Sequence, residues 1–96
     1  MTLFQQIQQR KATIVEIAAR HHACNLRVFG SVARGEEQLQ SDVDLLVEFL
    51  PGSTLVDHFS LVDALSAELG RRVDVVSERA LNKHIKQRVF SEAIAL

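Results

Sequence analysis

Apolar side chains recur at helical spacing in three segments of the chain, and each segment predicts an amphipathic helix. The first spans residues 3–22, and its apolar positions are Leu3, Phe4, Ile7, Ile14, Val15 and Ala18. The second begins at a Ser53 or Thr54 cap and ends at Gly70, and its apolar positions are Leu55, Phe59, Val62, Leu65 and Leu69. The third is the tail from Glu78, with Leu81, Ile85, Val89 and Ile94. Each helix therefore has one face to bury against another layer.

Three short apolar runs lie between these helices and predict strands at residues 26–29, 42–50 and 73–76. The first strand ends at Gly30, after which Ser31 is expected to cap a short helix through Arg34. A polar loop follows over residues 35–40, and Pro51-Gly52 stops the second strand. The element order predicts an α+β (α/β-like) fold for a single domain over residues 1–96, with helices packed on a sheet of at least three strands.

Composition narrows the possible classes of protein. The chain has 96 residues, 47% of them apolar, which supports one small folded core and argues against disorder. A net charge of −1 gives no basic footprint, so direct nucleic-acid binding is not expected. Cys24 is the only cysteine, which excludes an internal disulfide. The start shows no leader pattern and no apolar run is long enough for a membrane helix, so we expect a cytoplasmic protein with no membrane association.

The residues with the clearest chemistry are Asp42 and Asp44, at the start of the second predicted strand. Residues two apart on a strand project to the same face, so the two carboxylates should lie together. Their repulsion costs energy unless a cation relieves it. Next to a Gly30-Ser31 turn, such a pair can hold Mg²⁺ against the phosphates of a nucleotide. The alternative is that the two acids lie at an exposed strand start and are simply solvated, an interpretation that would suit the pair if no other motif accompanied it.

The spacing of these residues resembles a known family. Gly30-Ser31, ten further residues and then Asp42-x-Asp44 is similar to the signature of the nucleotidyltransferase fold of the DNA polymerase beta superfamily. Gly-Ser-x-Ala-Arg-Gly-Glu followed by Ser-Asp-x-Asp-Leu looks like its minimal nucleotidyltransferase branch, the MntA-like antitoxins. The resemblance covers roughly residues 25–77. It implies a mixed central sheet flanked by helices.

Four further assignments complete the expected site. Asp74 interrupts an apolar strand, and the resemblance implies that it joins Asp42 and Asp44 as a third metal ligand and catalytic residue, able to take the proton from the attacking hydroxyl. The alternative is an acid that faces water or pairs with Arg71 or Arg72. Gly30 and Ser31 are expected to hold phosphates, although an ordinary turn would also suit them. Arg34 either reaches those phosphates or pairs with Glu36 or Glu37.

The resemblance also implies an activity. It predicts an enzyme that uses Mg²⁺, as two ions, to move AMP from ATP onto a hydroxyl, with a tyrosine of a HEPN-type toxin RNase as acceptor. This chain contains no tyrosine, so the acceptor must belong to another protein in a hetero-oligomer. The alternatives are an antitoxin that acts by binding alone, and transfer to a small molecule. The second is disfavoured because so short a chain offers no acceptor domain.

Overall fold

A computed structural model of the chain describes residues 1–36 and 42–96. Residues 37–40 of the predicted loop at 35–40, among them the alternative Arg34 partner Glu37, lie outside the described residues. The strands in spatial order are β3 (Val73–Ser77), β2 (Val43–Phe49), β1 (Ala23–Phe29) and β4 (Ile94–Ala95). β2 and β3 are parallel, whereas β1 pairs antiparallel with both β2 and β4. The expected mixed sheet is therefore confirmed.

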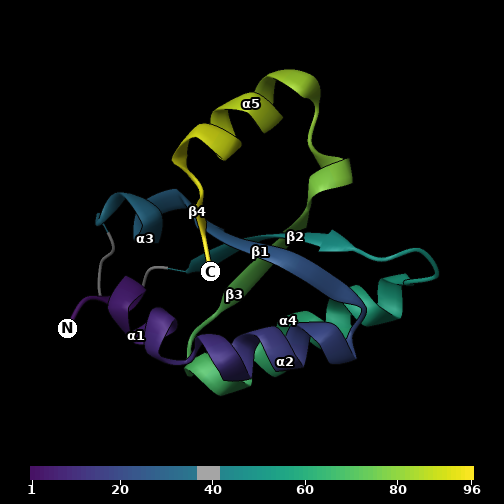
Figure 1. Cartoon of the computed structure of the whole chain (residues 1–96), viewed down its shortest axis with the longest axis horizontal. Coiled ribbons are helices and arrows are strands. Elements are labelled where there is room, and N and C mark those ends of the chain that lie inside the picture. Colours follow the sequence, from purple (N-terminus) through teal and green to yellow (C-terminus); the bar gives the residue numbers. More distant parts are fainter. Residues whose placement is uncertain (37–41) are drawn as a thin grey trace.

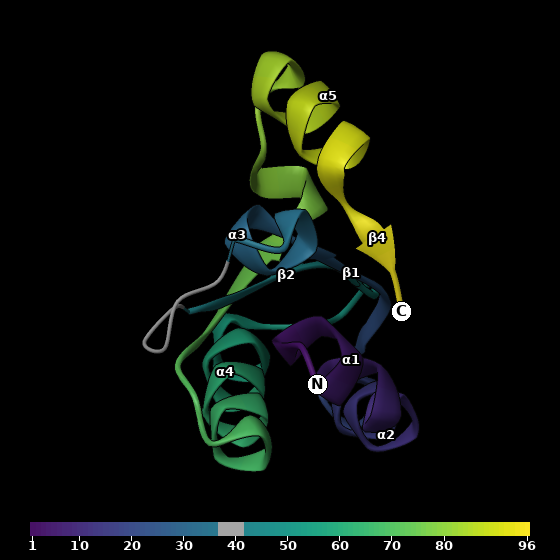
Figure 2. The same cartoon turned by 90° about the vertical axis from the view of Figure 1, so that its left-hand side faces the viewer.

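Helices cover both faces of the sheet. Figures 1 and 2 show three of them below it: α1 (Leu3–Gln9), α2 (Lys11–Arg20) and α4 (Leu55–Leu69). Above it lie the short α3 (Gly30–Arg34) and α5 (Lys83–Glu92), the latter preceded by a 3₁₀ turn at Glu78–Ala80. None of the described helices is long and apolar enough to cross a membrane.

The core lies between the sheet and the lower helices. Its fully buried side chains include Ile7, Ile14, Leu45, Leu61 and Leu65. On β2, Val43, Leu45 and Val47 belong to this core, so the alternate positions 44, 46 and 48 face the upper side. The parallel strand β3 behaves in the same way, with residues 73 and 75 in the core and 74 and 76 above. The pleat thus directs the strand aspartates away from the core.

The first predicted helix is wrong in one respect, because it is two helices. Arg10 ends α1 and begins α2, with φ −100° and ψ 13°. Its guanidinium donates a hydrogen bond to the carbonyl of Glu68 at the end of α4. The buried face keeps the predicted Leu3, Ile7 and Ile14, whereas Val15 is exposed. Hydrophobic spacing could not reveal this break, since both helices use the same apolar face.

The start of α4 also departs from the predicted pattern. The expected Thr54 cap is present, with Asp57 completing a capping box. Leu55 and Phe59, however, are 73% and 66% exposed. His58 takes the inward position instead, with its Nε2 atom 2.8 Å from the Val75 carbonyl oxygen and its ring against Phe49. His58, a polar residue with a backbone hydrogen-bond partner, thus lies where the periodicity predicts an inward-facing apolar residue.

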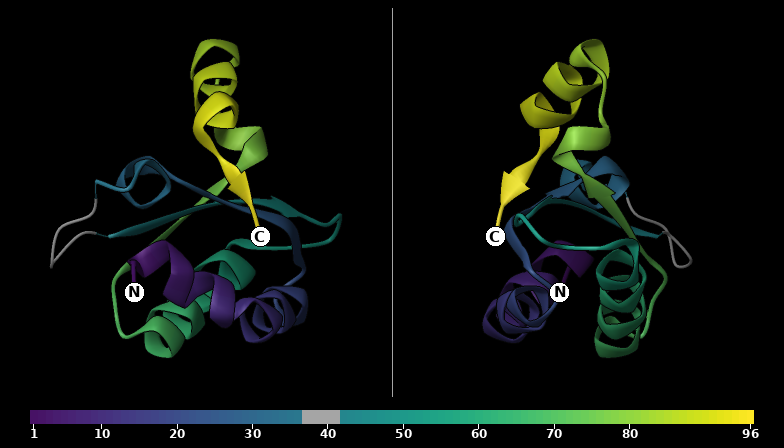
Figure 3. Two further views of the ribbon diagram at one scale, coloured as in Figure 1. Left: turned by 60° about the vertical axis from the view of Figure 1, so that its left-hand side comes forward. Right: turned by 90° about the vertical axis from the view of Figure 1, so that its right-hand side faces the viewer.

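The tail and the first strand differ from expectation at their ends. A new helix begins after Asn82, whose side chain accepts a hydrogen bond from the Ile85 amide. Ile94, predicted to be helical, belongs to β4 because it pairs with β1 at the edge of the sheet (Figure 3). α5 contains no buried residue and stands above the sheet.

β1 begins at Ala23, earlier than predicted, and the register of its pairing with β2 shifts between Cys24 and Arg27.

Candidate functional site

The parallel pairing of β2 and β3 brings two of the predicted acids side by side. Asp44 pairs in register with Asp74, and both side chains lie on the sheet face opposite the core. Asp42 immediately precedes β2, two residues before Asp44. The strand pairing therefore gathers three carboxylates at one edge, as expected from the spacing of Asp42 and Asp44 and from the unusual position of Asp74.

Gly30 lies directly against one of these carboxylates. Phe29, the last residue of β1, pairs with Asp44, and Gly30 then begins α3 with a φ of +72°. A Cβ atom at this position would lie 2.3 Å from Oδ2 of Asp44, far inside van der Waals contact. Only glycine satisfies both the left-handed backbone and the close approach. The carboxylate of Asp44 thus lies where a side chain at position 30 would begin.

The electrostatics of Asp44 reflect its crowded surroundings. Burial raises the pKa of its carboxyl group, and the neighbouring Asp74 and Asp42 carboxylates raise this pKa further. The guanidinium of Arg34 acts in the opposite direction, toward a lower pKa. The three carboxylates therefore repel one another in the absence of a cation. Such repulsion is expected at a site that binds a metal ion, because the ion relieves it.

Arg72 provides the positive charge nearest to two of the acids. Its Nε atom lies 3.8 Å from Oδ2 of Asp42 and 3.8 Å from Oδ1 of Asp74. The ion pair between Asp74 and Arg72, which the sequence suggested as an alternative role for this acid, is thus present. It does not exclude a ligand role, because the side chain of Asp74 remains 45% exposed and that of Asp42 40% exposed.

The remaining site residues lie on α3. Ser31 is the second residue of this helix and not its cap; Phe29 takes the cap position, without a side-chain hydrogen bond. Arg34 pairs with Glu36 at 2.9 Å and with Glu92 of α5 at 3.1 Å. The predicted Glu36 pair is confirmed, whereas the contact with Glu92 joins residues 58 positions apart and could not be read from local spacing.

The donor set suits a divalent ion such as Mg²⁺. Carboxylate oxygens are the ligands that Mg²⁺ prefers, and the absence of a side chain at Gly30 allows one of these carboxylates to lie against the backbone. Across residues 1–36 and 42–96, no three His, Cys, Asp or Glu side chains are close enough together to enclose an ion. The residues fit the ion by chemistry, and the three carboxylates would have to move closer together to enclose it.

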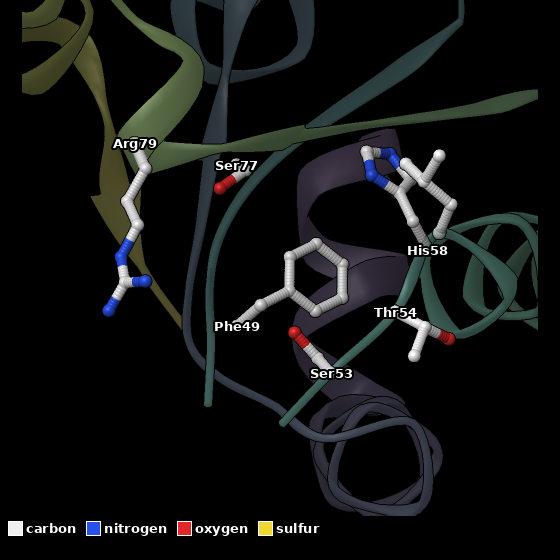
Figure 4. A pocket seen from close by; sticks show the side chains of 7 residues that line it. Phe49, Ser53, Thr54, His58, Ser77 and Arg79 are labelled. Carbon is white, nitrogen blue, oxygen red and sulfur yellow. The ribbon is translucent and has the colours of Figure 1, made fainter. Parts of the chain in front are cut away.

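A hollow of about 320 Å³ lies elsewhere, at the far end of β2. Figure 4 shows the ring of Phe49 in its middle, with Arg79 and His58 on opposite sides. The lining residues are Phe49, Ser53, Thr54, Leu55, His58, Ser77 and Arg79. It contains none of the predicted site residues and no carboxylate, so it is separate from the acids.

Comparison with known proteins agrees with this geometry. The model of the family described as "Polymerase beta, Nucleotidyltransferase" matches residues 12–96, which include the glycine turn and all three acids. The chain belongs to this nucleotidyltransferase family. The fold and the expected resemblance are thereby confirmed. The family match assigns the class of enzyme, while the roles of individual residues remain predictions.

Three similar proteins share most of the length of this nucleotidyltransferase. A candidate protein adenylyltransferase of Methanocaldococcus jannaschii is 36% identical over 92% of this chain and 95% of its own. The protein adenylyltransferase MntA of Thermococcus cleftensis is 38% identical over 82% of this chain and 80% of its own. A solved structure of a candidate minimal nucleotidyltransferase is 49% identical, with a TM-score of 0.89, over 100% of this chain and 97% of its own.

Two more distant solved structures share the fold of this nucleotidyltransferase. One is a toxin–antitoxin with AMP-PNP, 21% identical with a TM-score of 0.75, over 88% of this chain and 70% of its own. The other is a tri-AMPylated HEPN toxin of Shewanella oneidensis in complex with an MNT antitoxin. It is 19% identical with a TM-score of 0.69, over 92% of this chain and 69% of its own.

Proposed function

We propose that this chain is a Mg²⁺-dependent protein adenylyltransferase that moves AMP from ATP onto a tyrosine of a HEPN-type toxin and thereby acts as its antitoxin. The observation that carries the proposal is the in-register pair Asp44 and Asp74 beside Gly30, in a chain of the nucleotidyltransferase family. Relatives named protein adenylyltransferase, and the AMPylated toxin in a complex of the same fold, support the choice of acceptor.

In this proposal the nucleotide lies against the upper face of the sheet. Asp42, Asp44 and Asp74 would hold the divalent ions, as two Mg²⁺. When bound, Mg²⁺ would neutralise charge on the phosphates and on the departing pyrophosphate. Gly30 and Ser31 would bring backbone amides near the phosphates, and Arg34 would contact them once it leaves Glu36 or Glu92.

The transfer step conserves atoms and charge. The acceptor hydroxyl oxygen forms a bond to the α-phosphorus of ATP, and the bond from that phosphorus to the bridging oxygen of the β-phosphate breaks. Pyrophosphate leaves, and the hydroxyl proton passes to the carboxylate of Asp74. A general base in such a position contributes about 10²–10⁴ in rate. AMP remains attached to the acceptor as a phosphodiester.

The acceptor must come from another chain, because this sequence has no tyrosine. We therefore expect a hetero-oligomer in which residues 1–96 supply one catalytic domain and the partner completes the acceptor site. The cytoplasm, which supplies ATP, is the expected location. ATP labelled at its α-phosphate or at its γ-phosphate tests the reaction in the presence of a HEPN-type toxin.

The expected result is label on the partner from α-labelled ATP only, and its loss in Asp44→Asn. Label from γ-labelled ATP would indicate phosphoryl transfer and contradict the proposal. If neither label is transferred while the toxin is still neutralised, the chain acts by binding alone. Label on an added small molecule, with none on the partner, would instead favour a small-molecule acceptor.

A further inference from the structure

Arg72 occupies an unusual position between two of the three acids. Its Nε atom is equally distant, at 3.8 Å, from a carboxylate oxygen of Asp42 and one of Asp74. Its backbone is fixed, because its carbonyl oxygen accepts a 3.0 Å hydrogen bond from the amide of Val43 at the start of β2. The side chain, by contrast, is 76% exposed. A hydrogen-bonded backbone thus carries an exposed cation at the edge of the acidic site.

The two ion pairs are loose. At 3.8 Å both separations exceed normal hydrogen-bond lengths, so the attraction is electrostatic and open to water. The remaining acid, Asp44, lies on the same face of the sheet, in register with Asp74, so three carboxylates share the site with the exposed guanidinium of Arg72. The site therefore still lacks full charge compensation. A doubly charged ion would compensate it better than one exposed guanidinium.

We propose that Arg72 is a positioning residue that serves as the built-in counter-cation of this carboxylate site. It neutralises Asp42 and Asp74 while no metal is bound, and it moves aside when a divalent ion enters. This inference rests on the proposed metal role of the three acids. Arg34 differs from Arg72, because it makes its ion pairs with Glu36 and Glu92, although its charge also attracts Asp44.

Two consequences follow from this role. Because Arg72 competes with the metal for the same oxygens, its removal should strengthen metal binding. Because the acids then repel one another without compensation, its removal should also lower the stability of the metal-free protein. A residue that instead contacts nucleotide phosphates would act in the opposite way, since its loss would weaken binding of the metal–nucleotide complex.

The test is Mn²⁺ binding to the full chain, measured by calorimetry without nucleotide. Four variants accompany the wild type: Arg72→Gln, Arg72→Lys, Arg20→Gln and Asp44→Asn. Arg20 lies on α2 below the sheet and pairs with Glu16, so Arg20→Gln removes the same charge away from the acids. The urea midpoint of each protein without metal provides a second readout.

We expect Arg72→Gln to bind Mn²⁺ roughly three- to tenfold more tightly, as removal of a cation within a few ångströms of the ion implies. Its metal-free urea midpoint should fall below that of the wild type. Arg72→Lys and Arg20→Gln should stay near the wild type in both readouts. Unchanged or weaker Mn²⁺ binding in Arg72→Gln, or equal tightening in Arg20→Gln, would overturn the inference.

The Asp44→Asn variant separates this inference from the proposed function. If the wild type binds Mn²⁺ and Asp44→Asn does not, the metal site stands, and an unaffected Arg72→Gln overturns only the role of Arg72. If the wild type shows no Mn²⁺ binding that depends on Asp44, the proposed metal site fails and the role of Arg72 fails with it.

Discussion

Gly30 lies against the carboxylate of Asp44, and a Cβ atom on this glycine would lie 2.3 Å from Oδ2 of that acid. The chain offers a matched comparison in Gly35, at the other end of α3. Gly35 has nearly the same φ, +71° against +72°, but a Cβ atom there would meet nothing within 4 Å. Substitutions at Gly35 and Gly30 therefore distinguish the cost of backbone strain alone from the added cost of contact with Asp44.

Gly30→Ala should therefore cost more than Gly35→Ala. Left-handed backbone alone costs about 1–2 kcal/mol for a residue with a side chain, which is the expected loss in Gly35→Ala. Gly30→Ala adds displacement of Asp44 and should lose about 1–3 kcal/mol more, with weaker nucleotide binding. Urea unfolding and nucleotide titration of both variants provide the measurement. Equal losses in both variants would mean that the contact with Asp44 has no role.

Metal binding should stabilise the folded chain through the three acids. Mg²⁺ with a non-hydrolysable ATP analogue should raise the thermal midpoint, because both ligands bind the folded state. Asp42→Asn/Asp44→Asn should lose this rise, and its metal-free midpoint should equal or exceed that of the wild type because repulsion is relieved. Asp63→Asn, an exposed acid on α4, is the control. A full rise in the double variant would rule out these ligands.

Arg34 has two possible roles, and its ion pair with Glu92 allows them to be separated. Arg34→Gln and Glu92→Gln both break the same 3.1 Å pair, but only the first removes the guanidinium. Both should leave the urea midpoint almost unchanged, since the pair is exposed to solvent. ATP-analogue affinity should fall in Arg34→Gln and be retained in Glu92→Gln. Equal affinities would leave Arg34 a purely structural residue.

The capping box of α4 predicts a dependence of stability on pH. The Thr54 backbone amide holds the pKa of Asp57 below its ordinary value of 3.8, with smaller help from His22. A lowered folded-state pKa gives stability that is present above pH 3.8 and is lost as the pH falls through the lowered value. Asp57→Asn should therefore be less stable than the wild type near neutral pH, and the difference should shrink below pH 3.8. A urea midpoint difference that is constant with pH would contradict this origin.

Much of the site could be predicted because it depends on local rules. Alternation along a strand places Asp42 and Asp44 on one face, and an acid within the apolar run Val73–Val76 stands out at once. The sequence also places Gly30 directly after a strand, but the contact with Asp44 that requires glycine there depends on the pairing of β1 with β2. These features need only a strand register, which the hydrophobic pattern strongly restricts.

The structural features that the sequence does not predict depend on contacts between segments far apart in the chain. Arg34 with Glu92, and Arg10 with the Glu68 carbonyl, each join residues 58 positions apart. His58 replaces Phe59 on the inward face of α4 because the Val75 carbonyl offers it a partner. The sequence indicates Arg72 only as an alternative partner of Asp74. Its position between two acids depends on how β3 pairs with β2.

The most direct test of the central claim is the intact mass of the HEPN-type partner after incubation with this chain, Mg²⁺ and ATP. We expect the partner to gain the mass of one adenylyl group per transfer, on tyrosine. Asp74→Asn should slow this gain by about 10²–10⁴ while retaining more nucleotide binding than transfer. A partner that is neutralised with no change of mass, and equally well by the Asp42→Asn/Asp44→Asn variant, would contradict it.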